Sequence, residues 1–161
     1  GMRPDDERIP DSFEIARKMG LSYSFGIANL TSAHPNSVVL EVKGKSGRTL
    51  EVQACSLGGG RIMINRLDGL DVNCSCEIPT LIVHNLDQPG HVAEVTSMLA
   101  HKSVNIANMS LYRDKRGGSA VMVVEMDQPL PKESLEWLEH LEGIVKVTYI
   151  NVTEGEEDDV L

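Results

Sequence analysis

The first half of the chain alternates apolar and polar residues in a pattern that predicts one helix followed by several strands. Asp11 with Glu14 three residues later resembles a capping box, and Gly20 marks an end, so a helix is expected over residues 12–19. Short segments with partial period-two alternation follow, and glycine-containing turns separate them, as is typical of antiparallel strands. The expected strands cover residues 23–30, 36–43, 49–56, 61–67 and 70–76.

The pattern changes at Pro79, where strands begin to alternate with helices. Apolar residues recur at helical spacing over 91–101, and Pro131 is placed as the first residue of a second helix with Leu135, Leu138 and Leu141 on its apolar face. The order is βαββαβ, a ferredoxin-like unit. The expected strands of this unit cover residues 80–83, 105–112, 119–126 and 144–152.

The sequence therefore predicts an α+β protein with a small, mostly antiparallel sheet domain followed by a ferredoxin-like βαββαβ domain. We place the first domain at 1–77 and the second at 78–152. The remaining residues, 153–161, are strongly acidic and are expected to be a disordered tail.

Charge and hydropathy limit the classes of partner that this chain can be expected to bind. The 161 residues carry a formal net charge of −9, which repels DNA, RNA and anionic membrane surfaces. No run of about 20 apolar residues is present, so no membrane span is expected. The N-terminus lacks a basic segment followed by an apolar one, which favours a cytoplasmic protein.

The cysteines do not have the pattern of a metal site. Cys74 and Cys76 lie two residues apart and Cys55 is distant, which is not the spacing of a four-thiolate cluster. On a strand, Cys74 and Cys76 share one face and are expected to be reduced core residues. The sequence also lacks a nucleophile elbow, a P-loop and an HExxH motif. We therefore expect no catalytic residue and no metal ligand in this chain.

The turn from Asn85 to Gly90 is a candidate binding site because it ends at the start of a helix. A helix N-terminus offers unpaired N–H groups and partial positive charge, and Gly90 would let a carboxylate approach the backbone. The alternative is a plain strand-to-helix connection, in which Pro89 sets the entry and Asp87 caps the helix.

A second candidate lies in the first half. His34 and Asn36 are two residues apart at the start of an expected strand, so both side chains can face one polar ligand. Gly58, Gly59 and Gly60 form a loop whose N–H groups can surround an anion. The alternative is that His34 and Asn36 bond to turn backbone groups and that the glycines only bend the chain.

The segment Leu86-Asp87-Gln88-Pro89-Gly90, the helix after it and the segment 104–109 resemble the ACT domain family. The resemblance implies a ferredoxin-like domain that pairs through sheets or helices and binds an amino acid at the shared interface. It also implies ligand contacts from the first loop and the following strand. In this sequence those positions are Asn85, Asp87, Gly90, His91, Val92, Asn105, Ile106 and Asn108.

A wider resemblance covers nearly the whole chain. The segments 6–12, His34-Pro35-Asn36 and 56–62, followed by the ACT-like half, resemble the β subunit of bacterial iron–sulfur-dependent L-serine dehydratase. The resemblance implies a regulatory subunit of an enzyme that converts L-serine to pyruvate and ammonia. The implied partner is an α subunit that holds most of a [4Fe–4S] cluster, so no cofactor is expected here. His34 and Asn36 become candidates for binding L-serine or another small amino acid.

This sequence departs from that family at its start, because a longer N-terminal portion with a Ser-Ser-Ser-His-Thr motif is absent. We therefore expect an N-terminally truncated β subunit that forms a homodimer through its ACT or first domain. The main alternative is a free-standing ACT-domain sensor without catalytic activity. A second alternative is the regulatory tail of a phosphoglycerate dehydrogenase, although the chain has no dinucleotide-binding fingerprint. A third is a structural dimerisation domain with an empty site.

Overall fold

The computed structural model describes residues 2, 6–31 and 33–151, which form two compact units that divide between Ala33 and His34. The expected acidic tail at 153–161 lies outside the described residues. The expected domain boundary at 77/78 falls between the two sheets of the second unit and stays a prediction. In the part of the chain that the structure describes, no helix is long and apolar enough to cross a membrane.

The first unit begins with a helical segment. A 3-10 turn, η1 (Ile9–Asp11), leads directly into α1 (Ser12–Lys18). The expected capping box is wrong, because the chain is already helical before Asp11 and that side chain makes no capping hydrogen bond. The expected stop is confirmed: the helix ends just before Gly20, which has φ +78°, a left-handed conformation that glycine adopts without strain.

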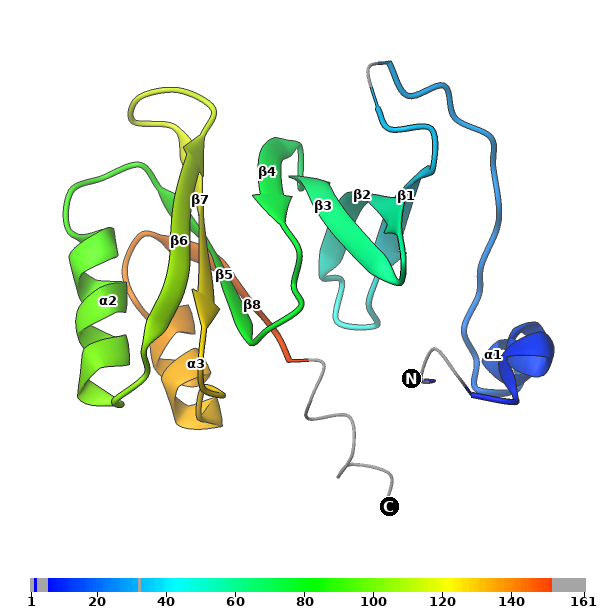
Figure 1. Cartoon of the computed structure of the whole chain (residues 1–161). Helices are drawn as coiled ribbons and strands as arrows, with labels where there is room; N and C mark the ends of the chain where they lie inside the picture. The colour runs from blue at the N-terminus through cyan, green and yellow to red at the C-terminus, as the bar shows by residue number, and fades with distance from the viewer. Residues whose placement is uncertain (1, 3–5, 32, 152–161) are drawn as a thin grey trace. The chain divides into compact units, whose positions relative to one another are not determined.

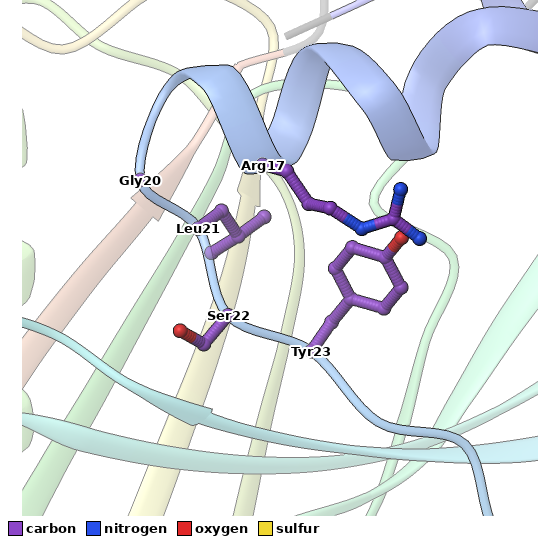
Figure 2. A pocket seen from close by; sticks show the side chains of 5 residues that line it. All are labelled: Arg17, Gly20, Leu21, Ser22 and Tyr23. Atoms are coloured by element: carbon purple, nitrogen blue, oxygen red, sulfur yellow. The ribbon is translucent and has the colours of Figure 1, made fainter.

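Extended chain follows α1 in the first unit. The expected strand at 23–30 is wrong, because no strand of the described residues pairs with its backbone. The rings of Phe13, Tyr23 and Phe25 contact one another, with centroids 5.3, 5.6 and 5.8 Å apart. The Arg17 guanidinium lies 5.8 Å from the centre of the Tyr23 ring, beside a depression of about 400 Å³ (Figure 2). The depression is lined by Arg17, Gly20, Leu21, Ser22 and Tyr23.

The second unit begins with an antiparallel meander (Figure 1). Its strands, in spatial as well as chain order, are β1 (Ser37–Lys43), β2 (Thr49–Gly58), β3 (Arg61–Leu67) and β4 (Leu70–Cys74). The four strands expected between residues 36 and 76 are therefore confirmed apart from their ends. β4 stops at Cys74 rather than at Cys76, because Cys76 has φ +53° and cannot continue a strand.

The βαββαβ unit follows. Its elements are β5 (Thr80–Leu86), α2 (His91–His101), β6 (Ile106–Arg113), β7 (Ser119–Met126), α3 (Lys132–Glu139) and β8 (Ile144–Ile150). The strands form one antiparallel sheet in the order β6-β7-β5-β8, with α2 and α3 on one face (Figure 1). The α+β class and the ferredoxin-like unit are confirmed.

Both faces of this second sheet are covered by apolar side chains. On one face, Leu81 and Val83 pack with residues of α2 and α3. On the other face, Ile82, Val121 and Val123 pack against β3 and β4 of the meander. Alternation along β5 explains the arrangement, since successive side chains point to opposite faces. The second unit therefore has two cores with the βαββαβ sheet between them.

Candidate functional site

The loop between β5 and α2 places a glycine at the start of a helix. Gly90 is the residue before α2 and has φ +111° and ψ −41°, a conformation that side chains rarely adopt. A Cβ placed on Gly90 would meet no atom within 4 Å, so the space above its backbone is open. The first N–H groups of α2 have no partner in the helix, which gives this end an affinity for anions.

Two buried polar atoms beside this helix end have no partner. Asn85 is 5% exposed; its Nδ2 donates to the carbonyl of Leu86 at 2.6 Å, whereas its Oδ1 is unpaired. His91 is 7% exposed; its Nδ1 lies 3.3 Å from Oε2 of Glu94, whereas its Nε2 is unpaired. Each unpaired buried atom costs about 1–3 kcal/mol, so a ligand that pairs with these atoms would gain that free energy.

Gly143, which precedes β8, supports the same loop and was not predicted from the sequence. Its carbonyl accepts the N–H of Leu86 at 2.9 Å. A Cβ on Gly143 would lie 2.6 Å from Nε2 of His91, so only glycine leaves room for the imidazole. A glycine before a strand is a common turn signal, and nothing in the sequence connects it with a residue fifty positions earlier.

Asp87 ties the loop to the turn between β6 and β7. Its Oδ2 accepts the N–H of Gly117 at 2.9 Å and Nη1 of Arg113 at 3.0 Å. These two hydrogen bonds, first the one from Gly117, lower the pKa of Asp87. Among the described residues no side chain caps α2, and the Asp87 carboxylate bonds to Gly117 and Arg113 instead, so the alternative in which Asp87 caps the helix is wrong. Asp87 positions the loop, and its carboxylate is already occupied.

The strand residues of the predicted set lie at the other end of the sheet. Asn85 pairs with Ala120, whereas Asn108 pairs with Glu125, which also pairs with the first residue of β5. Nδ2 of Asn105 donates to Asp127 at 2.6 Å, and Nδ2 of Asn108 donates to Glu125 at 2.9 Å. Within one chain, Asn105, Ile106 and Asn108 are therefore separated from Asn85, Gly90, His91 and Val92 by the length of β5.

The second predicted site lies at one end of the meander. Nδ1 of His34 accepts the N–H of Asn36 at 3.2 Å, and the carbonyl of Asn36 accepts the N–H of Ser56 at 2.9 Å. The register of β1, β2 and β3 brings this end close to the glycine loop, whose residues Gly58, Gly59 and Gly60 have φ of +85°, +62° and +77°. The ring of His34 thus bonds to turn backbone, as the alternative predicts, and every residue of this set is exposed.

A polar cluster joins the meander to the opposite face of β5. Nζ of Lys146 donates to Oδ2 of Asp68 at 2.5 Å and to the carbonyl of Thr49 at 2.9 Å. Burial works against ionisation of Asp68, but the hydrogen bonds from Lys146 and from the N–H of Glu51 lower its pKa overall. Nε2 of His84 is 3.6 Å from Oδ2 of Asp68, and burial lowers the pKa of His84.

The cysteines do not fit a cluster site. Cys55, Cys74 and Cys76 are buried, and Sγ of Cys74 lies 3.1 Å from Sγ of Cys76. Among the described residues, no group of three or more His, Cys, Asp or Glu side chains could hold a metal ion. An iron–sulfur cluster needs convergent thiolates. All three side chains are buried, and Cys74 and Cys76 belong to the core between the meander and the βαββαβ sheet.

Comparison with known proteins agrees with the geometry. The sequence model of the ACT domain matches residues 79–142, from the residue before β5 to the end of the α3 region. The fold and its loop thus define an ACT domain, a regulatory class of protein module. The L-serine dehydratase beta chain of Peptoniphilus asaccharolyticus is 31% identical over 153 residues, which are 94% of this chain and 69% of that protein. This chain belongs to the family of L-serine dehydratase beta chains.

Two further relatives show how much of this chain is shared with other proteins. The probable L-serine dehydratase beta chain of Bacillus subtilis is 33% identical over 145 residues, 90% of this chain and 66% of that protein. The chain therefore spans about two thirds of the length of these beta chains. A D-3-phosphoglycerate dehydrogenase of Methanocaldococcus jannaschii is 31% identical over 90 residues, 56% of this chain but only 17% of that enzyme.

Proposed function

We propose that this chain is a regulatory part of an L-serine ammonia-lyase and binds L-serine or another small amino acid at the N-terminus of α2. The observation that carries the proposal is the pair of buried, unpaired atoms at that position, Oδ1 of Asn85 and Nε2 of His91. The nearby helix N-terminus supplies free N–H groups, and the glycine that precedes it leaves open space.

The chemistry of these atoms matches a zwitterion. The carboxylate of Glu94 accepts a hydrogen bond, so we assign to His91 the tautomer with its proton on Nδ1, in which Nε2 is an acceptor. Oδ1 of Asn85 is an acceptor as well. An α-ammonium group donates hydrogen bonds to two such acceptors, while the α-carboxylate accepts from the helix N–H groups. A small opening of the loop exposes both acceptors to the ligand.

A second copy of the chain would complete the site. Asn105 and Asn108 lie at the far end of the sheet, so one ligand cannot contact them and Gly90 of the same chain. A two-fold axis that pairs two sheets in opposite directions brings these unlike ends together. We therefore propose a homodimer in which each amino acid touches the loop of one copy and the strand of the other.

The lyase reaction itself belongs to the assembled enzyme. We propose a cytoplasmic complex with an α subunit whose [4Fe–4S] cluster acts as a Lewis acid on the serine hydroxyl. We assign to this chain the binding of effector and the stabilisation of one state of the complex. An effector does so only if it binds the two states with different affinity.

Calorimetric titration of this chain with L-serine tests the proposal. Asn85→Ala should weaken binding at least about tenfold, because it removes a hydrogen bond worth about 1.4 kcal/mol or more. Gly90→Leu should weaken binding at least as much, because the new side chain fills the open space above the backbone. His101→Ala is the matched control, since this exposed histidine of α2 lies away from the loop. His34→Ala tests the meander site. Loss of binding in His34→Ala but not in Gly90→Leu would contradict the loop assignment.

The free-standing sensor remains the competing function. Similarity to D-3-phosphoglycerate dehydrogenases covers from about half of this chain to 86% of it, so similar segments occur in enzymes that are not named as lyases. Co-expression with an iron–sulfur α subunit separates the two functions. A stable complex whose lyase activity depends on this chain supports the subunit assignment, and serine binding without any complex supports the sensor.

A further inference from the structure

The segment that leaves the meander carries two thiols in contact. Cys74 is the last residue of β4 and Cys76 lies in the connection to β5, with relative exposures of 2% and 7%. In a regular strand, alternate side chains stand side by side about 6–7 Å apart. Here the left-handed turn at Cys76, with φ +53°, curls the chain and brings the Sγ atoms to 3.1 Å.

The two thiols differ in acidity. A hydrogen bond from Cys76 lowers the pKa of Cys74 despite its burial. The same hydrogen bond, together with burial, raises the pKa of Cys76. Cys74 therefore loses its proton more readily than Cys76, which is the property that separates an attacking from a resolving thiol.

The residues next to these two cysteines in the sequence are exposed or half-buried. Glu77 and Ile78, which follow Cys76 directly, are exposed, and Ser75 between the two cysteines is half-buried. A left-handed non-glycine residue stores backbone strain, and such strain occurs often at switch regions. Opening of this connection, together with release of Cys74 from its pairing with Ile64 at the end of β4, would expose both sulfurs.

We propose that Cys74 and Cys76 form a reversible dithiol–disulfide pair whose oxidant is a low-molecular-weight disulfide. The inference does not depend on the proposed function. It adds a redox modification site to the connection between the meander and the ACT domain.

The exchange balances in two steps. The Cys74 thiolate attacks one sulfur of the small disulfide, whose S–S bond breaks and releases one thiolate, leaving a mixed disulfide on Cys74. Cys76 then gives up its proton and attacks the Cys74 sulfur, which forms the Cys74–Cys76 bond and releases the second thiol. The two cysteines lose two electrons, and the small disulfide is reduced to two thiols.

Intact-mass analysis of the folded chain in glutathione disulfide tests the inference. The wild type should lose two hydrogen atoms without keeping an adduct, and dithiothreitol should restore them. Cys76→Ser should stop at one glutathionyl group on Cys74, because the resolving thiol is gone. Cys74→Ser should gain an adduct more slowly, since Cys76 holds its proton.

Cys55→Ser is the matched control, because Cys55 is equally buried but has no thiol neighbour in the described structure. It should behave as the wild type does. No loss of hydrogen in the wild type, loss only in urea, or a bond that maps to Cys55 would each overturn the inference. Peptide mapping of the wild type alone decides the matter if a serine variant does not fold.

Discussion

At the scale of single residues, the candidate site depends on how closely His91 lies against Gly143. The imidazole occupies the volume that any side chain at position 143 would need. Since Gly143 also has φ +80°, this position requires glycine for two separate reasons, its backbone conformation and the space above it. The position of the unpaired Nε2 thus depends on the absence of a side chain at Gly143.

Gly143→Ala should weaken binding of L-serine and lower the free energy of unfolding. Left-handed strain costs about 1–2 kcal/mol, and displacement of the imidazole adds about 1–3 kcal/mol. Gly47→Ala is the matched control, because Gly47 has φ +84° but open space around its Cβ position. Urea unfolding and calorimetry of both variants separate the two costs, and equal losses in both variants would show that His91 is not displaced.

Asp87 offers a second residue-scale test. Asp87→Asn keeps the shape of the side chain but removes its charge, so the bond with Arg113 weakens. The N–H of Gly117 is hydrogen-bonded to Asp87, so it should then exchange with deuterium several-fold faster. The N–H of Gly47 is the control, because it bonds to the carbonyl of Gly44 and its exchange rate should not change. Unchanged exchange at Gly117 would mean that the turn holds itself in place without the carboxylate.

At the scale of elements, β5 has different partners on its two faces. Asn85 belongs to the face that meets α2 and the ligand loop, whereas His84 faces the meander and lies near Asp68. Neighbouring residues of β5 therefore contact the candidate site on one face and the meander on the other.

The pH dependence of stability should report the environment of His84. Burial holds its pKa below the ordinary value of 6.5, so the unfolded chain takes up a proton before the folded one does. Stability from this group is complete above pH 6.5 and falls as the pH drops from 6.5 towards the lower folded pKa. Urea unfolding at about pH 8 and about pH 5.5 should show a smaller loss for His84→Gln than for the wild type.

The control for that experiment is His140→Gln, since His140 is exposed and its Nδ1 bonds to the carbonyl of Glu136. His140→Gln should lose as much free energy of unfolding between about pH 8 and about pH 5.5 as the wild type loses. A wild-type loss that His84→Gln leaves unchanged would assign the effect to other groups.

At the scale of the whole second unit, Lys146 and Asp68 join the two sheets. Their side chains are 15% and 28% exposed, and the pair adds a backbone contact to Thr49. In a double-mutant cycle, Lys146→Met and Asp68→Asn should show a coupling free energy of about 0.5–3 kcal/mol in urea unfolding. The exposed pair Arg66 and Asp71 is the control, for which about 0–1 kcal/mol is expected.

The sequence predicted the elements better than it predicted their contacts. Spacing such as that of Val92, Val95 and Leu99 is a local signal, so the βαββαβ order and the meander could be read from it. The strand expected at 23–30 failed because alternation does not supply a pairing partner. In the candidate site, Gly90 and His91 follow from a motif, but the roles of Gly143 and Glu94 depend on packing that no local pattern records.

The meander that covers the helix-free face of the βαββαβ sheet limits how this gene can be divided. The match to the ACT family covers only residues 79–142 and so suggests that this part folds alone. A fragment that begins at Thr80 would nevertheless expose the apolar side chains of Ile82, Val121 and Val123 to solvent. Such a fragment should be recovered from cells mainly as insoluble material. Transfer of this ACT domain into another protein should therefore include residues 37–74, which cover that face.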